Sequence, residues 1–169
     1  MTSDTSTHNV KLIDTFYSHF KELNAEGMIA CYHPDVLFFD PVFQELQGER
    51  VFAMWQMLCS KAQKFQLNYA GIQANELTGS ARWYASYDFS ATGRRIHNSI
   101  TAKFEFFEGK IIKHHDNFNL WRWSSMALGA PGLVLGWSPI IRQKVRQAAR
   151  ENLHNFMTSN NTPVDPSAE

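Results

Sequence analysis

The sequence predicts an α+β domain in which helices come first and a long antiparallel sheet follows. Apolar residues recur at spacings of three and four near the start of the chain, then at a spacing of two, and again at helical spacing near the C-terminus. The first spacing is typical of amphipathic helices and the second of half-buried strands. Helices followed by a run of strands favour an architecture in which helices cover one face of a curved sheet.

Three helical segments and one short strand are predicted before the sheet. The first helix covers residues 8–24 and has one apolar face. A second helical pattern over residues 25–32 is broken at Pro34, because the residue before a proline is pushed out of the helical region. A strand over residues 36–40 follows, and a third helix runs over residues 48–64.

The period-two region divides into four strands, which are separated by short turns. Connections of this length join antiparallel neighbours. The expected strands are residues 65–74, 80–91, 95–107 and 110–123.

One domain, over residues 1–157, is expected from a chain of 169 residues. Its core covers residues 8–123, and a last helix covers residues 138–157. The apolar residues 126–137 are interrupted by glycine and proline, so we expect a lid over the cavity mouth or a packing segment rather than one regular helix. Residues 158–169 are polar, contain proline and are expected to be disordered.

The charges restrict the partners. Sixteen basic and sixteen acidic residues give a formal net charge of zero, so neither nucleic acid nor a membrane is expected as a partner. The N-terminus is polar, and no apolar run approaches the ~20 residues of a membrane span. Cys31 and Cys59 occupy apolar positions of helical patterns, which is typical of reduced core thiols. These observations predict a cytoplasmic protein.

Two acidic residues stand among aromatic residues. Asp40 lies in Phe-Phe-Asp-Pro-Val-Phe, and Asp116 lies in His-His-Asp-Asn-Phe-Asn-Leu-Trp. Burial disfavours a charged carboxylate and raises its pKa, which makes it a usable base near neutral pH. Asp40 before a proline is equally typical of a turn that ends a strand. The alternative for Asp116 is an ion pair with Lys103 or Lys113 on the outer face of the sheet.

Strand alternation adds ligand-binding candidates. His114, Asp116 and Phe118 share one face of the last strand, and His115 faces the other way. Asn98 is the strongly polar residue on the apolar face of its strand. Three large side chains are expected to line the same cavity, namely Trp55, Trp83 and Tyr87. Only alternate residues of His-His-Asp converge, and no further His or Cys lies at ligand spacing, so no metal is expected. No cofactor is expected either, because the preferred mechanism is acid–base chemistry.

The order of elements over residues 8–123 resembles the nuclear transport factor 2-like cone of ketosteroid isomerase, limonene-epoxide hydrolase and the SnoaL-like polyketide cyclases. Cys31-Tyr32 through Phe39-Asp40-Pro41-Val42 is similar to the isomerase segment that carries the general base. Gly109-Lys110-Ile111 through Asp116-Asn117-Phe118-Asn119-Leu120 resembles the last strand of the hydrolases and cyclases. The resemblance implies a curved antiparallel sheet around N-terminal helices, a base at Asp40 and an active-site acid at Asp116.

The whole pattern, with Ala53-Met54-Trp55 and Thr92-Gly93-Arg94, resembles SnoaL-like proteins more closely still. Where the isomerases carry oxyanion-hole donors, this chain has Phe16 and Ala102, and Tyr17 is expected to point elsewhere. The hydrolase arginine–aspartate pair falls on Ser86 and Asp88, and Asp88 is expected to face away from the cavity. These departures weigh against steroid isomerisation and leave epoxide-hydrolase-like water activation as a second alternative. Phe16 is expected to line the cavity and contact the ligand.

We expect a cofactor-free acid–base enzyme of the isomerase, cyclase or lyase kind, with an apolar carbonyl-containing ligand. Asp40 or Asp116 removes a proton beside the carbonyl, and the sequence does not decide between them. His114 and Asn98 donate hydrogen bonds to the oxyanion, with Tyr87 as a further donor. The alternatives are a non-catalytic binding or carrier protein and a structural dimerisation module.

A homodimer through the outer face of the sheet is also expected. That face mixes charged and aromatic residues, with Tyr84 and Trp121 as anchors.

Overall fold

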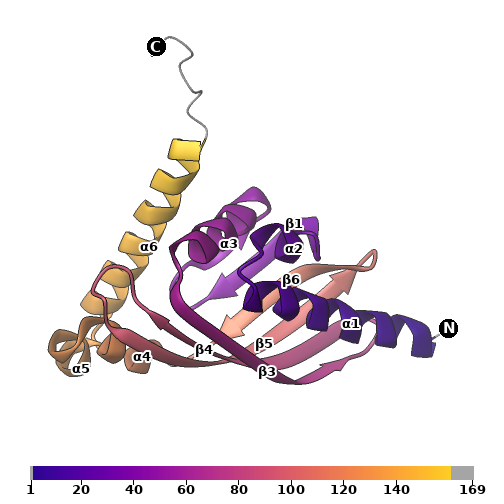
Figure 1. The fold of residues 1–169 in the computed structure, drawn as a ribbon, viewed down its shortest axis with the longest axis horizontal. Coiled ribbons are helices and arrows are strands. Elements are labelled where there is room, and N and C mark those ends of the chain that lie inside the picture. The colour runs from indigo at the N-terminus through magenta and orange to yellow at the C-terminus, as the bar shows by residue number, and fades with distance from the viewer. Residues whose placement is uncertain (1, 161–169) are drawn as a thin grey trace, which may run out of the picture.

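The computed structural model describes residues 2–160 (Figure 1). Helices and strands occur in groups along the chain, in a mixed α+β order. The elements are α1 (Thr2–Lys21), α2 (Ala25–Ile29), β1 (Tyr32–Asp40), β2 (Gln44–Gln47), α3 (Glu49–Lys61), β3 (Gln63–Ala74), β4 (Thr78–Asp88), β5 (Arg95–Phe107), β6 (Lys110–Asn117), α4 (Leu120–Leu128), α5 (Ala130–Leu135) and α6 (Pro139–Asn160).

The six strands form one curved, unclosed sheet in the order β2-β1-β6-β5-β4-β3. Helices α1, α2 and α3 lie on one side of this sheet (Figure 1), which is called its inner face below. The fold is therefore the predicted α+β cone. One detail of the prediction is wrong, because β1 pairs with β6 in parallel. The long chain between these two strands, from β2 to β5, provides the crossover that a parallel pair requires.

The start of β1 lies earlier than predicted. Helix α2 ends at Ile29, and Pro34 lies inside β1 instead of breaking a helix. The pairing of β1 with β6 shifts register between Tyr32 and Leu37. A proline is tolerated in such an irregular stretch because its missing N–H is not needed for a ladder hydrogen bond. The short strand β2 was not predicted.

The predicted strand over residues 110–123 is too long. Strand β6 ends at Asn117, and the side chain of Asn119 caps α4 by accepting a hydrogen bond from the N–H of Arg122. Trp121 therefore lies on α4 and not on the sheet, so it is not an anchor of the outer sheet face. Phe118 lies in the turn between the two elements.

Residues 126–137 were predicted not to form one regular helix, and the structure agrees. Gly129 adopts a φ of +70° and separates α4 from the six-residue α5, a conformation that favours glycine. The turn between β4 and β5 holds this region, because Thr92 Oγ1 donates to the carbonyl of Ala127 and Arg94 Nε donates to that of Met126, both at 2.7 Å. Helix α6 continues to Asn160, and the rest of the tail that was expected to be disordered lies outside the described residues.

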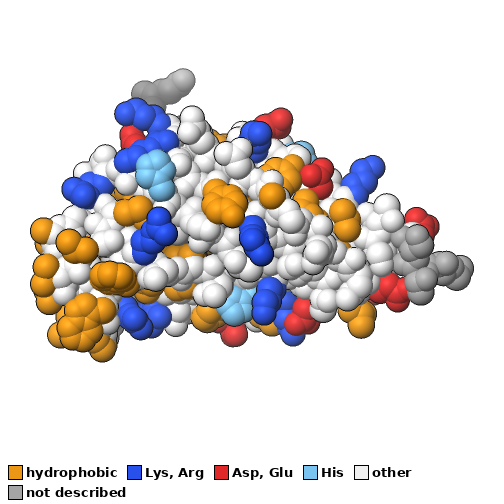
Figure 2. All heavy atoms as spheres, turned by 90° about the horizontal axis from the view of Figure 1, so that it is seen from below, with side chains coloured by type: hydrophobic (Ala, Val, Ile, Leu, Met, Phe, Trp, Pro, Cys, Tyr) orange, Lys and Arg blue, Asp and Glu red, His pale blue; other side chains and the backbone are white. Residues whose placement is uncertain are grey.

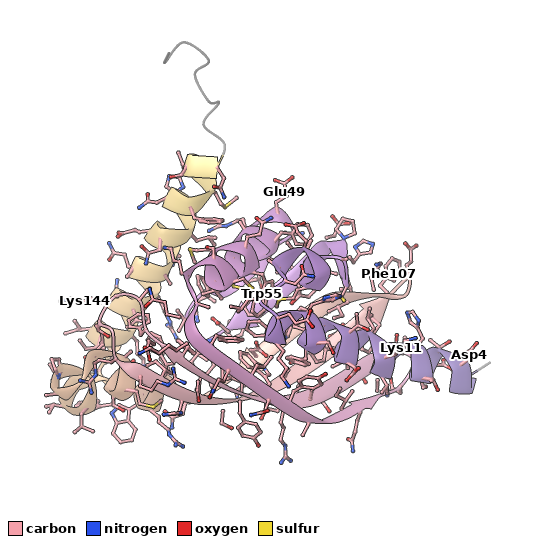
Figure 3. All side chains as sticks on the ribbon, in the orientation of Figure 1. Asp4, Lys11, Glu49, Trp55, Phe107 and Lys144 are labelled. Atoms are coloured by element: carbon pink, nitrogen blue, oxygen red, sulfur yellow. The ribbon has the colours of Figure 1, made fainter. Side chains whose placement is uncertain are left out.

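The hydrophobic core lies between the helices and the inner face. Trp55 points from α3 into this space (Figure 3). Cys31 and Cys59 are buried, unpaired core thiols, and Leu153 brings α6 into the same core. Within residues 2–160, no helix is both long and apolar enough to cross a membrane.

Candidate functional site

His114 and Asp116 form a buried pair on the inner face. The alternation of β6 directs both side chains inward, and they are 1% and 2% exposed. His114 Nε2 lies 3.0 Å from Asp116 Oδ1. His115 is exposed on the outer face, where its ring meets the ring of Phe39 edge-on. The prediction that the two adjacent histidines face opposite ways is confirmed.

Tyr32 and two tryptophans extend this pair into a network. The Tyr32 hydroxyl lies 2.6 Å from His114 Nδ1 and accepts a hydrogen bond from Trp55 Nε1 at 3.0 Å. Because Trp55 can only donate, the tyrosine proton is free to point at Nδ1, and Nε2 then carries a proton that faces Asp116. Trp83 Nε1 also donates to Asp116 Oδ1, at 3.1 Å.

Both tryptophans were predicted only as lining, and the structure gives them hydrogen bonds to the network. Tyr32 was missed. Its position at the end of an apparent helical pattern concealed that it begins a strand and faces inward.

Aromatic rings fill the space around His114. The rings of Phe16, Phe38, Trp55 and Phe104 have centroids between 4.5 and 6.2 Å from the imidazole. A low-dielectric environment of this kind strengthens the hydrogen bonds of the network. Phe16 is completely buried in this interior, and its contact with a ligand stays a prediction.

Tyr17 also points into the interior, so the prediction that it points elsewhere is wrong. Successive residues of a helix lie 100° apart, and α1 is enclosed widely enough to bury both Phe16 and Tyr17 completely. The Tyr17 hydroxyl has no hydrogen-bond partner among residues 2–160. Burial raises its pKa well above the ordinary value, and the nearby charge of Asp116 raises it further. The hydroxyl therefore stays protonated and is available as a donor.

Asp40 is the last residue of β1, and it is 9% exposed. Burial raises its pKa to about 7; the hydrogen bond from the N–H of Phe43 opposes this shift, and the charge of Asp116 adds to it. Its Oδ1 accepts hydrogen bonds from the N–H of Val42 at 2.8 Å and of Phe43 at 2.5 Å. The carboxyl therefore combines the two predicted alternatives, a strand-ending turn and a group that titrates near neutral pH.

Helices α4 and α6 approach the end of the sheet that holds Asp40. Trp123 of α4 donates from Nε1 to the Tyr87 hydroxyl at 2.9 Å. Burial raises the pKa of Tyr87, with a smaller contribution from the charge of Asp40. Arg146 of α6 donates to the carbonyl of Pro41 at 3.1 Å. These contacts place both helices next to the residues that surround Asp40.

Asn98 and Phe118 are half-buried, and Asn98 pairs with Ala85 on the inner face of the sheet. Among the described residues, the Asn98 amide makes no hydrogen bond, so it can contact a ligand.

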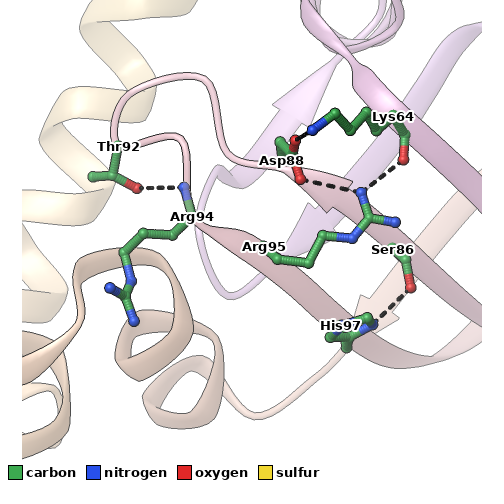
Figure 4. Close-up of polar contacts among 7 residues, drawn as sticks. All are labelled: Lys64, Ser86, Asp88, Thr92, Arg94, Arg95 and His97. Carbon is green, nitrogen blue, oxygen red and sulfur yellow. Dashed lines mark hydrogen bonds and ion pairs between the residues drawn. The ribbon is translucent and has the colours of Figure 1, made fainter.

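The Ser86–Asp88 region is a polar cluster at the sheet rim (Figure 4). Ser86 Oγ lies 2.8 Å from His97 Nδ1, and Asp88 pairs with Lys64 and Arg95, both at 3.1 Å. Asp88 is thus engaged away from Asp116, as predicted. Within the described part of the chain, no group of three or more His, Cys, Asp or Glu side chains is placed to hold a metal ion.

Two hollows lie elsewhere on the surface. One, of about 860 Å³, crosses the outer face of the sheet beside Phe39, Lys103 and His115. The other, of about 630 Å³, lies beside Lys64 and Arg95. His114 belongs to the strand that lines the first hollow, but neither hollow is lined by Asp40 or Asp116. The interior that was predicted to be a conical pocket is occupied around His114 by aromatic side chains.

A family model described as the SnoaL-like domain matches residues 13–114. None of the curated proteins compared with the sequence is significantly similar.

Solved structures share the fold at low sequence identity. An LEH-like epoxide hydrolase from M. tuberculosis is 16% identical, with 79% of this chain and 98% of that chain covered and a TM-score of 0.62. A candidate polyketide cyclase from Xanthomonas campestris pv. campestris is 18% identical over 73% and 98%, with a TM-score of 0.62. A candidate SnoaL-like polyketide cyclase from Jannaschia sp. CCS1 is 11% identical over 75% and 95%, with a TM-score of 0.65.

Proposed function

The chain belongs to the SnoaL-like domain family, and from this premise we propose that it is an acid–base enzyme of the cyclase or isomerase kind, with Asp40 as its base. The observation that carries the proposal is the burial of the Asp40 carboxyl at the end of β1, where it is 9% exposed; this burial raises its pKa to about 7. A base is most effective when its pKa lies near the working pH. Asp116 is less suited to this role, since its Oδ1 is already engaged by His114 and Trp83.

The proposed reaction starts at a C–H bond next to a carbonyl group. The Asp40 carboxylate takes the proton, and the electron pair of the C–H bond moves toward the carbonyl oxygen. The resulting enolate either regains the proton at another carbon, which is isomerisation, or attacks a second carbonyl of the same molecule, which is cyclisation. Isomerisation requires a C=C bond conjugated with the enolate, so that the proton returns at the far carbon of that system; in cyclisation a C–C bond forms and the oxygen of the attacked carbonyl takes the proton from Asp40. Neither outcome needs a redox partner.

Tyr17 and Asn98 are the donors that we assign to the enolate oxygen. The Tyr17 hydroxyl is buried without a partner among the described residues, and its pKa is raised by burial and then by Asp116. A preorganised donor of this kind stabilises charge that develops during the reaction. We do not propose His114 as an oxyanion donor, because its ring nitrogens lie within hydrogen-bond distance of Tyr32 and Asp116. We assign it a positioning role for Asp116.

We propose that α4 and α5 act as a lid. Trp123 contacts Tyr87, near Asp40, and Gly129 supplies a break between the two helices. Closure excludes water from the site and displacement admits a ligand. The aromatic interior favours a mostly apolar ligand.

A carrier protein is the second candidate function. The specific observation in its favour is the packing around His114, where four aromatic rings enclose a network whose ring nitrogens are satisfied without a ligand. In this role the same polar groups orient a bound molecule and take no proton.

Hydrogen–deuterium exchange distinguishes the two functions. Aromatic 1,3-diketones incubated with the protein in heavy water should exchange the hydrogens between their carbonyls faster than in buffer, with a rate that rises through pH 7. Asp40→Asn keeps an oxygen for the N–H groups of Val42 and Phe43 and should lose at least about 100-fold of the rate. Asp35→Asn is the matched control, because Asp35 is exposed on the same strand. Diketone binding with no Asp40-dependent exchange would favour the carrier.

We also propose that the outer sheet face pairs with a second copy. Tyr84 and Phe39 are 46% and 36% exposed on it, and charged side chains of both signs surround them. A mixed aromatic and polar surface of this kind suits a two-fold interface.

A further inference from the structure

An exposed apolar cluster forms one end of the molecule, around α5. Five of its residues are between 48% and 66% exposed; this cluster, called the apolar tip, consists of Leu133, Val134, Leu135, Trp137 and Ile140. Figure 2 shows the corresponding end, at the left, as a group of orange side chains with blue ones nearby. Contiguous apolar surface of this kind marks an interaction site.

The backbone of the apolar tip is held in place by its own contacts. Trp137 Nε1 donates to the carbonyl of Val134 at 3.0 Å, and Trp121 Nε1 donates to that of Leu133 at 3.3 Å. Gly132 packs so closely on α4 that a Cβ there would lie 2.0 Å from the carbonyl oxygen of Ser124. Both indole N–H groups are thus satisfied within the segment, and the tip presents its apolar side chains outward.

The chain segment that contains the apolar tip is one-sided in charge. Residues 117–150 contain no Asp or Glu and five basic residues, whereas the other 135 residues carry 11 basic and 16 acidic ones. The five are Arg122, Arg142, Lys144, Arg146 and Arg150. Among the described residues, none of them forms an ion pair. The zero net charge of the chain conceals this local excess.

We propose that the apolar tip docks on a membrane surface rich in anionic phospholipid. The apolar side chains enter the boundary between headgroups and acyl chains, and the exposed cations nearest in sequence, Arg142 and Lys144, contact the headgroups. This departs from the expectation of no membrane partner, which rested on the overall charge balance. A second copy on the same surface is disfavoured, because a two-fold contact would bring the two cationic flanks together. The inference is independent of the proposed catalysis.

Vesicle flotation of the full chain tests the proposal. Vesicles of phosphatidylcholine with about one third phosphatidylglycerol should carry the protein upward at low salt, and pure phosphatidylcholine should carry at least about tenfold less. Leu133→Glu should reduce the bound fraction at least about tenfold. Leu77→Glu is the matched control, since Leu77 is 70% exposed in the turn between β3 and β4 and should have no effect.

Charge reversal provides the second pair of variants. Arg142→Glu with Lys144→Glu should weaken flotation as strongly as Leu133→Glu, whereas Lys11→Glu with Lys21→Glu on α1 should not. No flotation with anionic vesicles would overturn the proposal. Equal binding to neutral and anionic vesicles would also overturn it. The same holds if sedimentation shows a dimer that Leu133→Glu dissociates and the protein does not bind vesicles. Circular dichroism spectra matching the wild type keep loss of folding from being mistaken for loss of binding.

Discussion

The Tyr32 hydroxyl lies 2.6 Å from His114 Nδ1, and this contact determines how the imidazole faces Asp116. The tyrosine occupies Nδ1 as donor while its oxygen accepts from Trp55. The proton on Nε2 is then directed at the carboxylate of Asp116. A residue at the start of β1 thus orients an acid near the end of β6.

Tyr32→Phe should destabilise the protein by about 2 kcal/mol or more, because it leaves Trp55 Nε1 and His114 Nδ1 buried without a partner. Urea unfolding measures the effect. Tyr69→Phe is the control: its hydroxyl bonds Ser18 and Asp14 in an exposed region, and we expect less than about 1 kcal/mol. Equal losses in the two variants would contradict the role given to the network.

Stability should depend on pH through Asp40. Its pKa is raised to about 7 in the folded state, so between about pH 4 and pH 7 the folded protein binds more protons than the unfolded chain. The contribution of Asp40 to stability should therefore be complete below about pH 4 and be lost as the pH rises to 7, a loss of up to about 4 kcal/mol. Asp40→Asn should remove this loss in urea unfolding, and Asp35→Asn should retain it. Parallel curves for wild type and Asp40→Asn would refute the raised pKa.

Arg94 should control the opening of α4 and α5. Arg94→Ala removes the hydrogen bond to Met126, and amide hydrogen exchange over residues 126–137 should then accelerate about five- to tenfold. Arg95 beside it is the matched control, because it pairs with Asp88 and with the carbonyl of Lys64 (Figure 4). Unchanged amide exchange in Arg94→Ala would contradict the claim that Arg94 holds α4 and α5 in place. Truncation is a poorer test, since Leu153 of α6 belongs to the core.

The outer face should mediate dimerisation. Light scattering of the wild type at micromolar concentration should give twice the 19.4 kDa chain mass, and Tyr84→Glu should give a monomer. Trp121→Glu should leave the dimer intact, because Trp121 lies on α4. A monomeric wild type would exclude this interface, and a dimer sensitive only to Trp121→Glu would move the interface to α4, next to the apolar tip.

The fold was predictable because apolar periodicity reports on which side of an element is buried. The bounds of β5 and the inward direction of His114 and Asp116 followed from it. The end of β6 before Asn119 was missed because the residues after Asn119 are rich in aromatic side chains, which are as typical of a strand as of the helix that they form. Tyr17 was misplaced since periodicity does not say how much of a helix is enclosed. The contact between Tyr32 and His114 spans 82 residues and depends on a parallel strand pair that no local pattern specifies.

The most direct test of Asp40 as the base is its own titration. Carbonyl-detected NMR of the protein labelled at aspartate side chains, with Asp40→Asn to assign the signal, gives the pKa of this carboxyl. We expect a value near 7, as burial dictates, and a lower value in Asp116→Asn, because the charge of Asp116 raises the pKa of Asp40. A pKa near 4 in the wild type, as in an exposed aspartate, would contradict the proposal that Asp40 takes a proton at neutral pH.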